Sequence, residues 1–189
     1  MNTNYPKSII EYYCSNPSSF EERVNSTKKK INLVLMAVSL LLIIFPSIIP
    51  IGNWIVRIVA IIGLLYFGLA AFLFDRSWYN KVSGGKIKEI AIKKFAFPER
   101  GSTWGSEDDQ RIIAMFERED WVGLANERAA DDRPMQLYIH EDAIGKTFYL
   151  QLMCYLPGVY IIQGVTDVKV INEPQYSEVY KIIKSIKST

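Results

Sequence analysis

Residues 31–49, INLVLMAVSLLLIIFPSII, and residues 51–74, IGNWIVRIVAIIGLLYFGLAAFLF, decide the organisation of this 189-residue chain. The first run carries no charge, and the second carries only Arg57. About 20 apolar helical residues cross a hydrocarbon core of about 30 Å, so each run is long enough to do so. The short break between them contains Pro46, Pro50 and Gly52. The two runs therefore predict a membrane hairpin of two transmembrane helices.

Basic residues flank both outer ends of this predicted hairpin. Lys and Arg near the ends of membrane helices set their orientation, because cytoplasmic segments are enriched in them. We therefore expect a multi-pass membrane protein with both termini in the cytoplasm and the turn on the far side. The flanking residues are Lys28, Lys29, Lys30, Arg76, Lys81, Lys86 and Lys88.

Three residues of the second run are candidates for assembly between copies of the chain. Gly63 and Gly68 are small enough to let two helix backbones approach closely in a membrane. Arg57 either reaches the membrane interface beside Trp54 or lines a pore and pairs between protomers. The sequence leaves both interpretations of Arg57 open.

The rest of the chain divides around the hairpin, which we place at residues 31–75. Residues 1–30 predict a cytoplasmic leader with short helices, one of them starting at Ser19, where Glu22 completes a capping-box spacing. This leader either lies along the inner membrane face or packs against the soluble domain. Residues 76–84 form a linker, and residues 85–189 form a cytoplasmic domain.

Alternation of polar and apolar residues indicates that this domain is rich in β-structure. Residues 135–140 and 147–156 alternate with period two, which is typical of half-buried strands. Residues 86–97, 121–128 and 159–171 add further expected strands. Residues 111–116 are compatible with a strand or a helix, and we expect a strand there. An amphipathic helix is expected to follow Asn172 and Pro174. Closure would remove the exposed edges of so small a sheet, so we expect an all-β, antiparallel, lipocalin-like β-barrel with a C-terminal helix.

Signatures of catalysis and metal binding are missing from the sequence. It contains no Gly-x-Ser-x-Gly elbow and no Gly-rich phosphate loop with a lysine, so we expect no enzyme, no cofactor and no metal site. Cys14 and Cys154 would face a reducing cytoplasm, which makes a disulfide improbable. His140 stands alone on an alternating strand and is interpreted as a solvated residue. Acidic groups at 107–109 and 131–132 lack a histidine partner.

Aromatic residues interleaved with arginines suggest instead a site for a small nucleotide. Guanidinium groups suit phosphate oxygens, and aromatic faces stack on bases. The alternative is that the aromatic residues fill a core and the arginines are solvated. Residues 76–189 contain sixteen Lys or Arg and sixteen Asp or Glu, a balance that argues against binding to DNA or RNA. The candidate ligand residues are Trp104, Arg111, Trp121, Arg128, Tyr138, Tyr149, Tyr155 and Tyr160.

This layout of a polar leader, two apolar runs and a β-rich domain of about a hundred residues resembles the two-transmembrane β-barrel effectors of bacterial CBASS antiphage systems. The resemblance implies that the barrel binds a cyclic oligonucleotide, such as a cyclic dinucleotide, made by a partner nucleotidyltransferase. Binding would then drive homo-oligomerisation, disruption of the inner membrane and death of the infected cell.

Two other functions remain open at the level of sequence. The protein could be a membrane-anchored scaffold or toxin-neutralising partner, whose β-domain binds another protein and no small molecule. It could also be a subunit of a small channel or transporter, although Arg57 is the only ionisable residue in either run.

Overall fold

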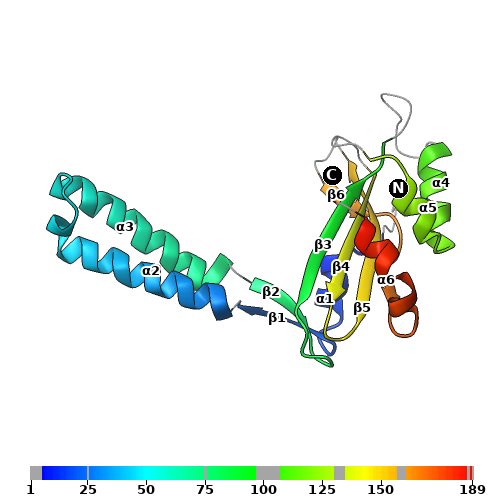
Figure 1. Cartoon of the computed structure of the whole chain (residues 1–189), viewed down its shortest axis with the longest axis horizontal. Helices are drawn as coiled ribbons and strands as arrows, with labels where there is room; N and C mark the ends of the chain where they lie inside the picture. Colours follow the sequence, from blue (N-terminus) through cyan, green and yellow to red (C-terminus); the bar gives the residue numbers. More distant parts are fainter. Residues whose placement is uncertain are drawn as a thin grey trace. The chain divides into compact units, whose positions relative to one another are not determined.

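The computed structural model describes residues 6–24, 26–74, 76–96, 107–129, 135–156, 161–186 and 188. The chain forms two compact units, whose elements are labelled in Figure 1. Glu22–Ser77 form the first, here called the helical unit. Met1–Glu21 and Trp78–Thr189 together form the second, here called the α/β unit. Most of the predicted leader thus belongs to the α/β unit.

The helical unit is built from the two apolar runs. Helix α2 spans Ser26–Ile44, and helix α3 spans Asn53–Leu69 and continues as a π-helical segment, η2, at Ala70–Phe74. A short 3₁₀ turn, η1, occupies Pro46–Ile48 between them. Proline disfavours helical geometry in the residue before it, which accounts for the end of α2 just ahead of Pro46. The two helices pack lengthwise against each other within this unit.

The prediction of two full transmembrane helices is wrong. Only Asn53–Leu73 is long and apolar enough to cross a membrane among the residues the structure describes. Helix α2 begins at Ser26, so its first five residues include three lysines. Its apolar part, residues 31–44, would extend only about 21 Å, less than the roughly 30 Å of hydrocarbon. The remaining residues of the first run lie in the turn.

An antiparallel sheet of five strands forms the centre of the α/β unit. The strands are β3 (Ile87–Lys94), β4 (Met135–Asp142), β5 (Thr147–Leu156), β6 (Ile161–Gly164) and β7 (Lys169–Ile171). Their order is β3-β4-β5-β6, with β7 also paired to β5, and all these pairings are antiparallel. A register shift between Glu89 and Ala91 marks a bulge in β3. Two further strands, β1 (Phe20–Val24) and β2 (Arg76–Asn80), pair separately.

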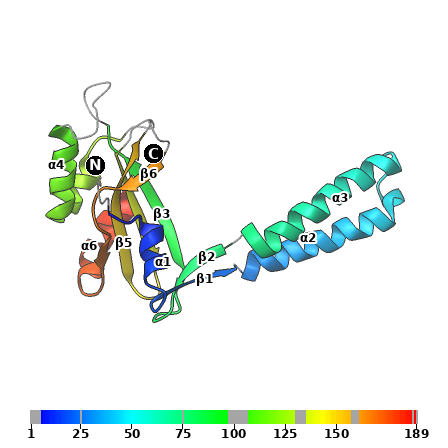
Figure 2. The same cartoon turned by 180° about the vertical axis from the view of Figure 1, so that it is seen from behind.

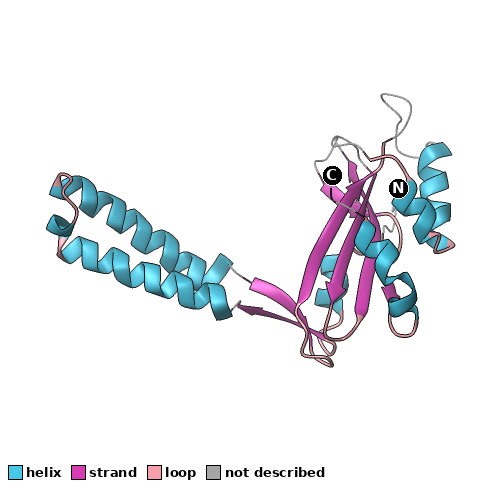
Figure 3. Ribbon diagram, in the orientation of Figure 1, coloured by secondary structure: helices cyan, strands magenta, loops and turns pink. Residues whose placement is uncertain are grey.

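Helices cover both faces of this sheet. Helices α4 (Glu107–Glu117), α5 (Trp121–Asn126) and α6 (Gln175–Ser185) lie on one face, as Figures 1 and 3 show. The short helix α1 (Ile9–Ser15) lies over the other face, which is turned to the viewer in Figure 2. The larger hydrophobic core lies under α4, α5 and α6, and a smaller aromatic core lies under α1. The odd and even residues of β5 therefore face different cores.

The expected closed β-barrel is not formed. The sheet path of the described strands begins at β3 and ends at β6 without joining them, so the α/β unit is a mixed helix-and-sheet structure. Residues expected as strands at 111–116 and 121–128 are mainly helical, in α4 and α5. Ile112 and Phe116 stand four residues apart, and both are fully buried on one side of α4. Asp120 caps α5 by accepting a hydrogen bond from the Gly123 amide at 2.8 Å.

Two expectations for the leader and linker also need correction. The helix expected to start at Ser19 is strand β1, and the capping box instead joins Ser8 and Glu11 at the start of α1. The expected linker at residues 76–84 contains strand β2 and part of a tight turn. Strand β1 pairs with β2, which lies far away in the sequence, and this pairing overrides the local preference for a helix at Ser19.

Candidate functional site

The outward surface of the helical unit is apolar along both helices. On α3, Ile58, Val59, Ile62 and Leu65 are exposed, and on α2 Val34, Leu41 and Ile44 are exposed. Only 22% of the most apolar stretch of Asn53–Leu73 is buried. A core helix of a water-soluble protein would be buried over a larger share of its residues. A monomer in water rarely exposes so large a continuous apolar surface. This surface fits a hydrocarbon environment.

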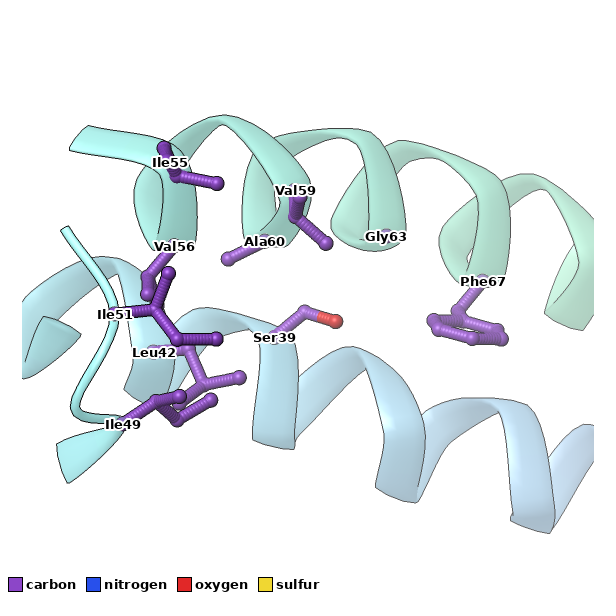
Figure 4. A pocket seen from close by; sticks show the side chains of 10 residues that line it. All are labelled: Ser39, Leu42, Ile49, Ile51, Ile55, Val56, Val59, Ala60, Gly63 and Phe67. Carbon is purple, nitrogen blue, oxygen red and sulfur yellow. The ribbon is translucent and has the colours of Figure 1, made fainter. Parts of the chain in front are cut away.

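An apolar cavity of about 240 Å³ lies between α2 and α3 (Figure 4). Ser39 is the one polar residue lining it, and its Oγ donates to the Leu35 carbonyl at 2.9 Å within α2. Gly63 faces Ser39 across the helix pair. A Cβ at Gly63 would lie 2.9 Å from Ser39 Oγ, which is too close without movement. Gly63 therefore serves the close packing of α2 and α3 within one chain.

The other assembly candidates lie apart from this contact. A Cβ at Gly68 would meet Met36 Sδ at 3.7 Å, an ordinary contact within the same helix pair. Arg57 is exposed in the second turn of α3, close in sequence to the exposed Trp54. An exposed Arg beside a Trp is the arrangement of a residue that reaches the membrane interface.

Basic residues gather at the other end of the helical unit. The Lys29 ammonium lies 5.0 Å from the centre of the Phe72 ring, so the start of α2 and the end of η2 are neighbours. Arg76 forms an ion pair with Glu22 at 3.1 Å. Lys28, Lys29, Lys30 and Arg76 thus belong to one end of the pair, and Arg57 belongs to the opposite end.

The predicted ligand residues divide between the two faces of the sheet in the α/β unit. Tyr138, Tyr149 and Tyr155 share the face that carries α1, as the pairing of β4 with β5 requires. Trp121 lies in the core on the opposite side, 4% exposed and edge-to-face with Phe116. The structure therefore gathers three of the tyrosines and separates them from Trp121.

The two described arginines of the predicted set lie outside this face. Arg111 on α4 forms a bidentate ion pair with Glu127 and a second contact with Asp108 at 3.6 Å. Arg128 is exposed after the end of α5. Trp104 and Tyr160 lie outside the described residues.

A groove of about 300 Å³ lies at the edge of the α1 face of the sheet. Pro6, Lys7 and Ser8 line one side, and residues 161–164 of β6 line the other. Tyr155 pairs with Ile162, so its side chain stands on the same face as that groove residue. This volume is at the lower end of the range for small-molecule sites, roughly 300 to 1,000 Å³.

Gln151 lies on the same face, close to the groove, and is completely buried. Its Nε2 donates to the Lys7 carbonyl at 2.7 Å and to the Thr166 carbonyl at 2.8 Å. Gly164 permits this approach, because a Cβ there would lie 2.7 Å from Gln151 Nε2. The Oε1 of Gln151 has no hydrogen-bond partner among the described residues. Gln151 therefore ties the chain before α1 to the sheet.

His140 is buried on the same face and was misjudged from the sequence. It is 7% exposed, because α1 covers it, and the Tyr13 hydroxyl lies 3.1 Å from its Nδ1. Its Nε2 lies 3.7 Å from Glu89 Oε2. Burial lowers the pKa of His140 to about 4, raises the pKa of Glu89 and raises the pKa of Tyr13. The imidazole is therefore neutral at pH 7, and it is not a solvated strand residue.

The described residues show no assembled metal centre. No group of three His, Cys, Asp or Glu side chains is placed to hold a metal ion there. The acidic residues at 107–109 form the first turn of α4, and the pair at 131–132 lies outside the described residues. Comparisons with protein families, with curated proteins and with solved structures give no match.

Proposed function

We propose that the protein is a membrane-anchored effector whose helical unit is inserted in a lipid bilayer. The observation that carries this proposal is the apolar outer surface of α2 and α3. Helix α3 with η2 has the length to cross the hydrocarbon, and the shorter apolar part of α2 packs against it. In water this surface would drive aggregation, whereas in hydrocarbon it needs no partner.

The basic end of the helical unit faces the cytoplasm in this proposal. The positive-inside rule supports that orientation, because Lys28, Lys29, Lys30 and Arg76 meet at one end. The α/β unit follows Arg76 directly in the chain and is therefore cytoplasmic, at the inner membrane of a bacterium. Arg57 and Trp54 anchor the opposite end at the far interface.

Membrane extraction tests this anchor. The full chain is expected to remain in the membrane pellet after alkaline carbonate treatment. Replacing Val59→Asp and Ile62→Asp places two charges on the exposed face of α3, at about 2.5 to 3.5 kcal/mol each. We expect this double variant to move largely into the soluble fraction. Val122→Asp, at an exposed valine of α5 in the α/β unit, serves as the control and should stay in the pellet. Release of the unmodified chain by carbonate would contradict the anchor.

The α/β unit acts in this proposal as the sensor of the effector, and the ligand is a cyclic oligonucleotide. The layout that resembles the CBASS effectors supports this choice. So does the α1 face, where Tyr138 and Tyr155 are half-buried and Tyr155 pairs with Ile162, a residue that lines a groove of ligand size. Aromatic faces stack on bases of any identity. A ligand that binds the assembled form more tightly would shift the population toward homo-oligomers by its difference in affinity.

Ligand binding is tested with the full chain in detergent and a panel of cyclic di- and trinucleotides. At 100-fold excess over the dissociation constant, binding adds about 2.7 kcal/mol and raises Tm by roughly 5 to 10 °C. We expect one member of the panel to raise Tm and to increase the size of the assembly. Tyr138→Ala and Tyr155→Ala should abolish the shift, whereas Arg111→Ala, on the other side of the sheet, should retain it. A panel without any shift favours the alternative function, a scaffold that binds another protein.

A further inference from the structure

Two tight turns lie side by side at one end of the sheet in the α/β unit. The turn between β2 and β3 covers residues 81–85, and the turn between β4 and β5 covers residues 143–146; we call them together the turn pair. Val82 at one tip is 88% exposed, and Ile144 at the other is 70% exposed. No other large apolar side chain among the described residues is as exposed as these two. The turn pair therefore presents two apolar tips.

Asp142 holds the two turns together. Its fully buried carboxylate accepts hydrogen bonds from the Ile144 amide at 3.1 Å, from the Gly145 amide at 2.9 Å and from the Ser83 hydroxyl of the other turn. A Cβ at Gly85 or Gly145 would overlap this carboxylate, so both glycines are required for the approach. Val82 and Ile144 are thus held in fixed positions relative to each other, and binding at their tips costs little ordering entropy.

The Val82 turn is fixed in the same way by Asn80. Its Oδ1 accepts a hydrogen bond from the Val82 amide at 2.9 Å, and its backbone carbonyl accepts one from the Gly84 amide at 2.9 Å. Gly84 adopts a φ of 70°, a left-handed conformation that glycine adopts without strain. Val82 is therefore an apolar residue at the tip of an ordered turn, and no described part of the chain covers it.

Three lysines lie close to the two apolar tips along the chain. Lys81 precedes Val82, Lys86 follows the same turn, and Lys146 follows Ile144 with its side chain 60% exposed. Two acidic residues contact the turn pair: Asp142 is buried, and Glu173 forms an ion pair with Lys146 at 3.0 Å. Apolar tips with lysines beside them in the chain match the chemistry of an anionic bilayer surface, which has phosphate groups outside and hydrocarbon beneath them.

The turn pair is close along the chain to the helical unit. The Lys81 amide donates to the Ser19 carbonyl at 2.8 Å, and its ammonium donates to the Pro17 carbonyl at 2.6 Å. Ser19 immediately precedes β1, and Lys81 immediately follows β2, the two strands through which the chain enters and leaves the helical unit. Each strand has five residues and spans at most about 17 Å. An inserted helical unit therefore keeps the turn pair within reach of the membrane surface.

We propose that the turn pair docks the α/β unit on an anionic lipid surface, with Val82 and Ile144 entering the interface and Lys81, Lys86 and Lys146 contacting headgroups. This inference rests on the proposed membrane anchor. The turn pair binds the bilayer in which the same chain is anchored, so docking needs no second protein. Docking gives the α/β unit a defined orientation at the membrane surface, which adds to the proposed function.

Site-specific fluorescence of the full chain in vesicles tests this docking. An environment-sensitive probe is attached to Val82→Cys or Ile144→Cys in a Cys14→Ser background. Cys154 remains, because it is buried and burial raises the pKa of its thiol to about 11. Val122→Cys is the matched control on α5, and Val59→Cys on α3 reports insertion of the helical unit. Nitroxide-labelled lipid quenches probes that enter the bilayer.

We expect quenching at residues 82 and 144 to exceed that at residue 122 by roughly two-fold in vesicles containing phosphatidylglycerol. The excess should disappear in phosphatidylcholine alone, and Lys81→Gln and Lys146→Gln should each weaken docking about five-fold. Equal quenching at 82, 144 and 122 while residue 59 is quenched overturns this inference and leaves the anchor intact. An equal excess of quenching at residues 82 and 144 in both lipids would show that docking does not require anionic lipid. Absence of quenching at residue 59 removes the anchor and the docking together.

Discussion

Acidification from about pH 7 to about pH 4 is expected to lower the free energy of unfolding of the α/β unit by up to about 3 kcal/mol through His140. The pKa of this histidine falls from 6.5 to about 4 because it is buried. The unfolded chain therefore binds a proton that the folded chain excludes. The stabilising contribution is complete above about pH 6.5 and is lost as the pH falls toward 4. Denaturant unfolding of the full chain in detergent, followed by near-ultraviolet circular dichroism, measures this loss.

His140→Gln is the matched variant for this prediction. Glutamine does not titrate in this range and can still form a hydrogen bond with the Tyr13 hydroxyl. The stability of the variant should therefore change less between the two pH values. Glu89 opposes His140, because burial raises its pKa and its folded form favours the proton. Glu89→Gln should consequently steepen the acid loss of the parent chain. An identical pH dependence in the parent chain and in His140→Gln would show that His140 does not carry the effect.

Asp142→Ala is expected to destabilise the α/β unit by about 3 kcal/mol or more. The carboxylate is fully buried and accepts three hydrogen bonds that join two turns. Alanine leaves the amides of Ile144 and Gly145 without their acceptor, and the loss of a buried partner costs more than the net gain of one hydrogen bond. Thermal unfolding of the full chain in detergent measures the difference as a fall in Tm.

Asp142→Asn separates the hydrogen bonds from the charge. The asparagine Oδ1 still accepts from both amides, and its Nδ2 can donate to Ser83, so we expect a loss of about 1 kcal/mol. The same pair of variants bears on the turn pair, because Asp142→Ala should also release the fixed spacing of Val82 and Ile144. Equal stability of Asp142→Ala and the parent chain would show that the turns hold their geometry without this carboxylate.

Local sequence patterns predicted the sheet more accurately than the helices around it. Period-two alternation at residues 135–140 and 147–156 corresponds to β4 and β5, and the segment after Pro174 forms α6. The prediction of strands at residues 111–116 and 121–128 was wrong, because a short run of apolar residues is compatible with either a strand or a helix. The spacing of Ile112 and Phe116 and the cap at Asp120 were the helix signals available in the sequence.

Closure of the sheet could not be deduced from strand patterns. Alternation indicates that each strand has two different faces, but it does not state what covers them. In this chain one face is covered by α4, α5 and α6 and the other by α1, so both are protected without a barrel. The burial of His140 could not be deduced from the strand pattern either. Tyr13, which covers it, lies 127 positions away in sequence.

The sequence by itself determined that residues 31–74 are apolar and that basic residues flank them, because hydropathy is a property of local composition. Only the tertiary structure decided that α2 begins among its lysines, that Gly63 packs against Ser39, and that one helix has the length to cross a bilayer. The same holds for the turn pair, where Asp142 joins two turns about sixty residues apart. Helix ends and long-range contacts depend on which segments meet in space, and the one-dimensional pattern does not contain that information.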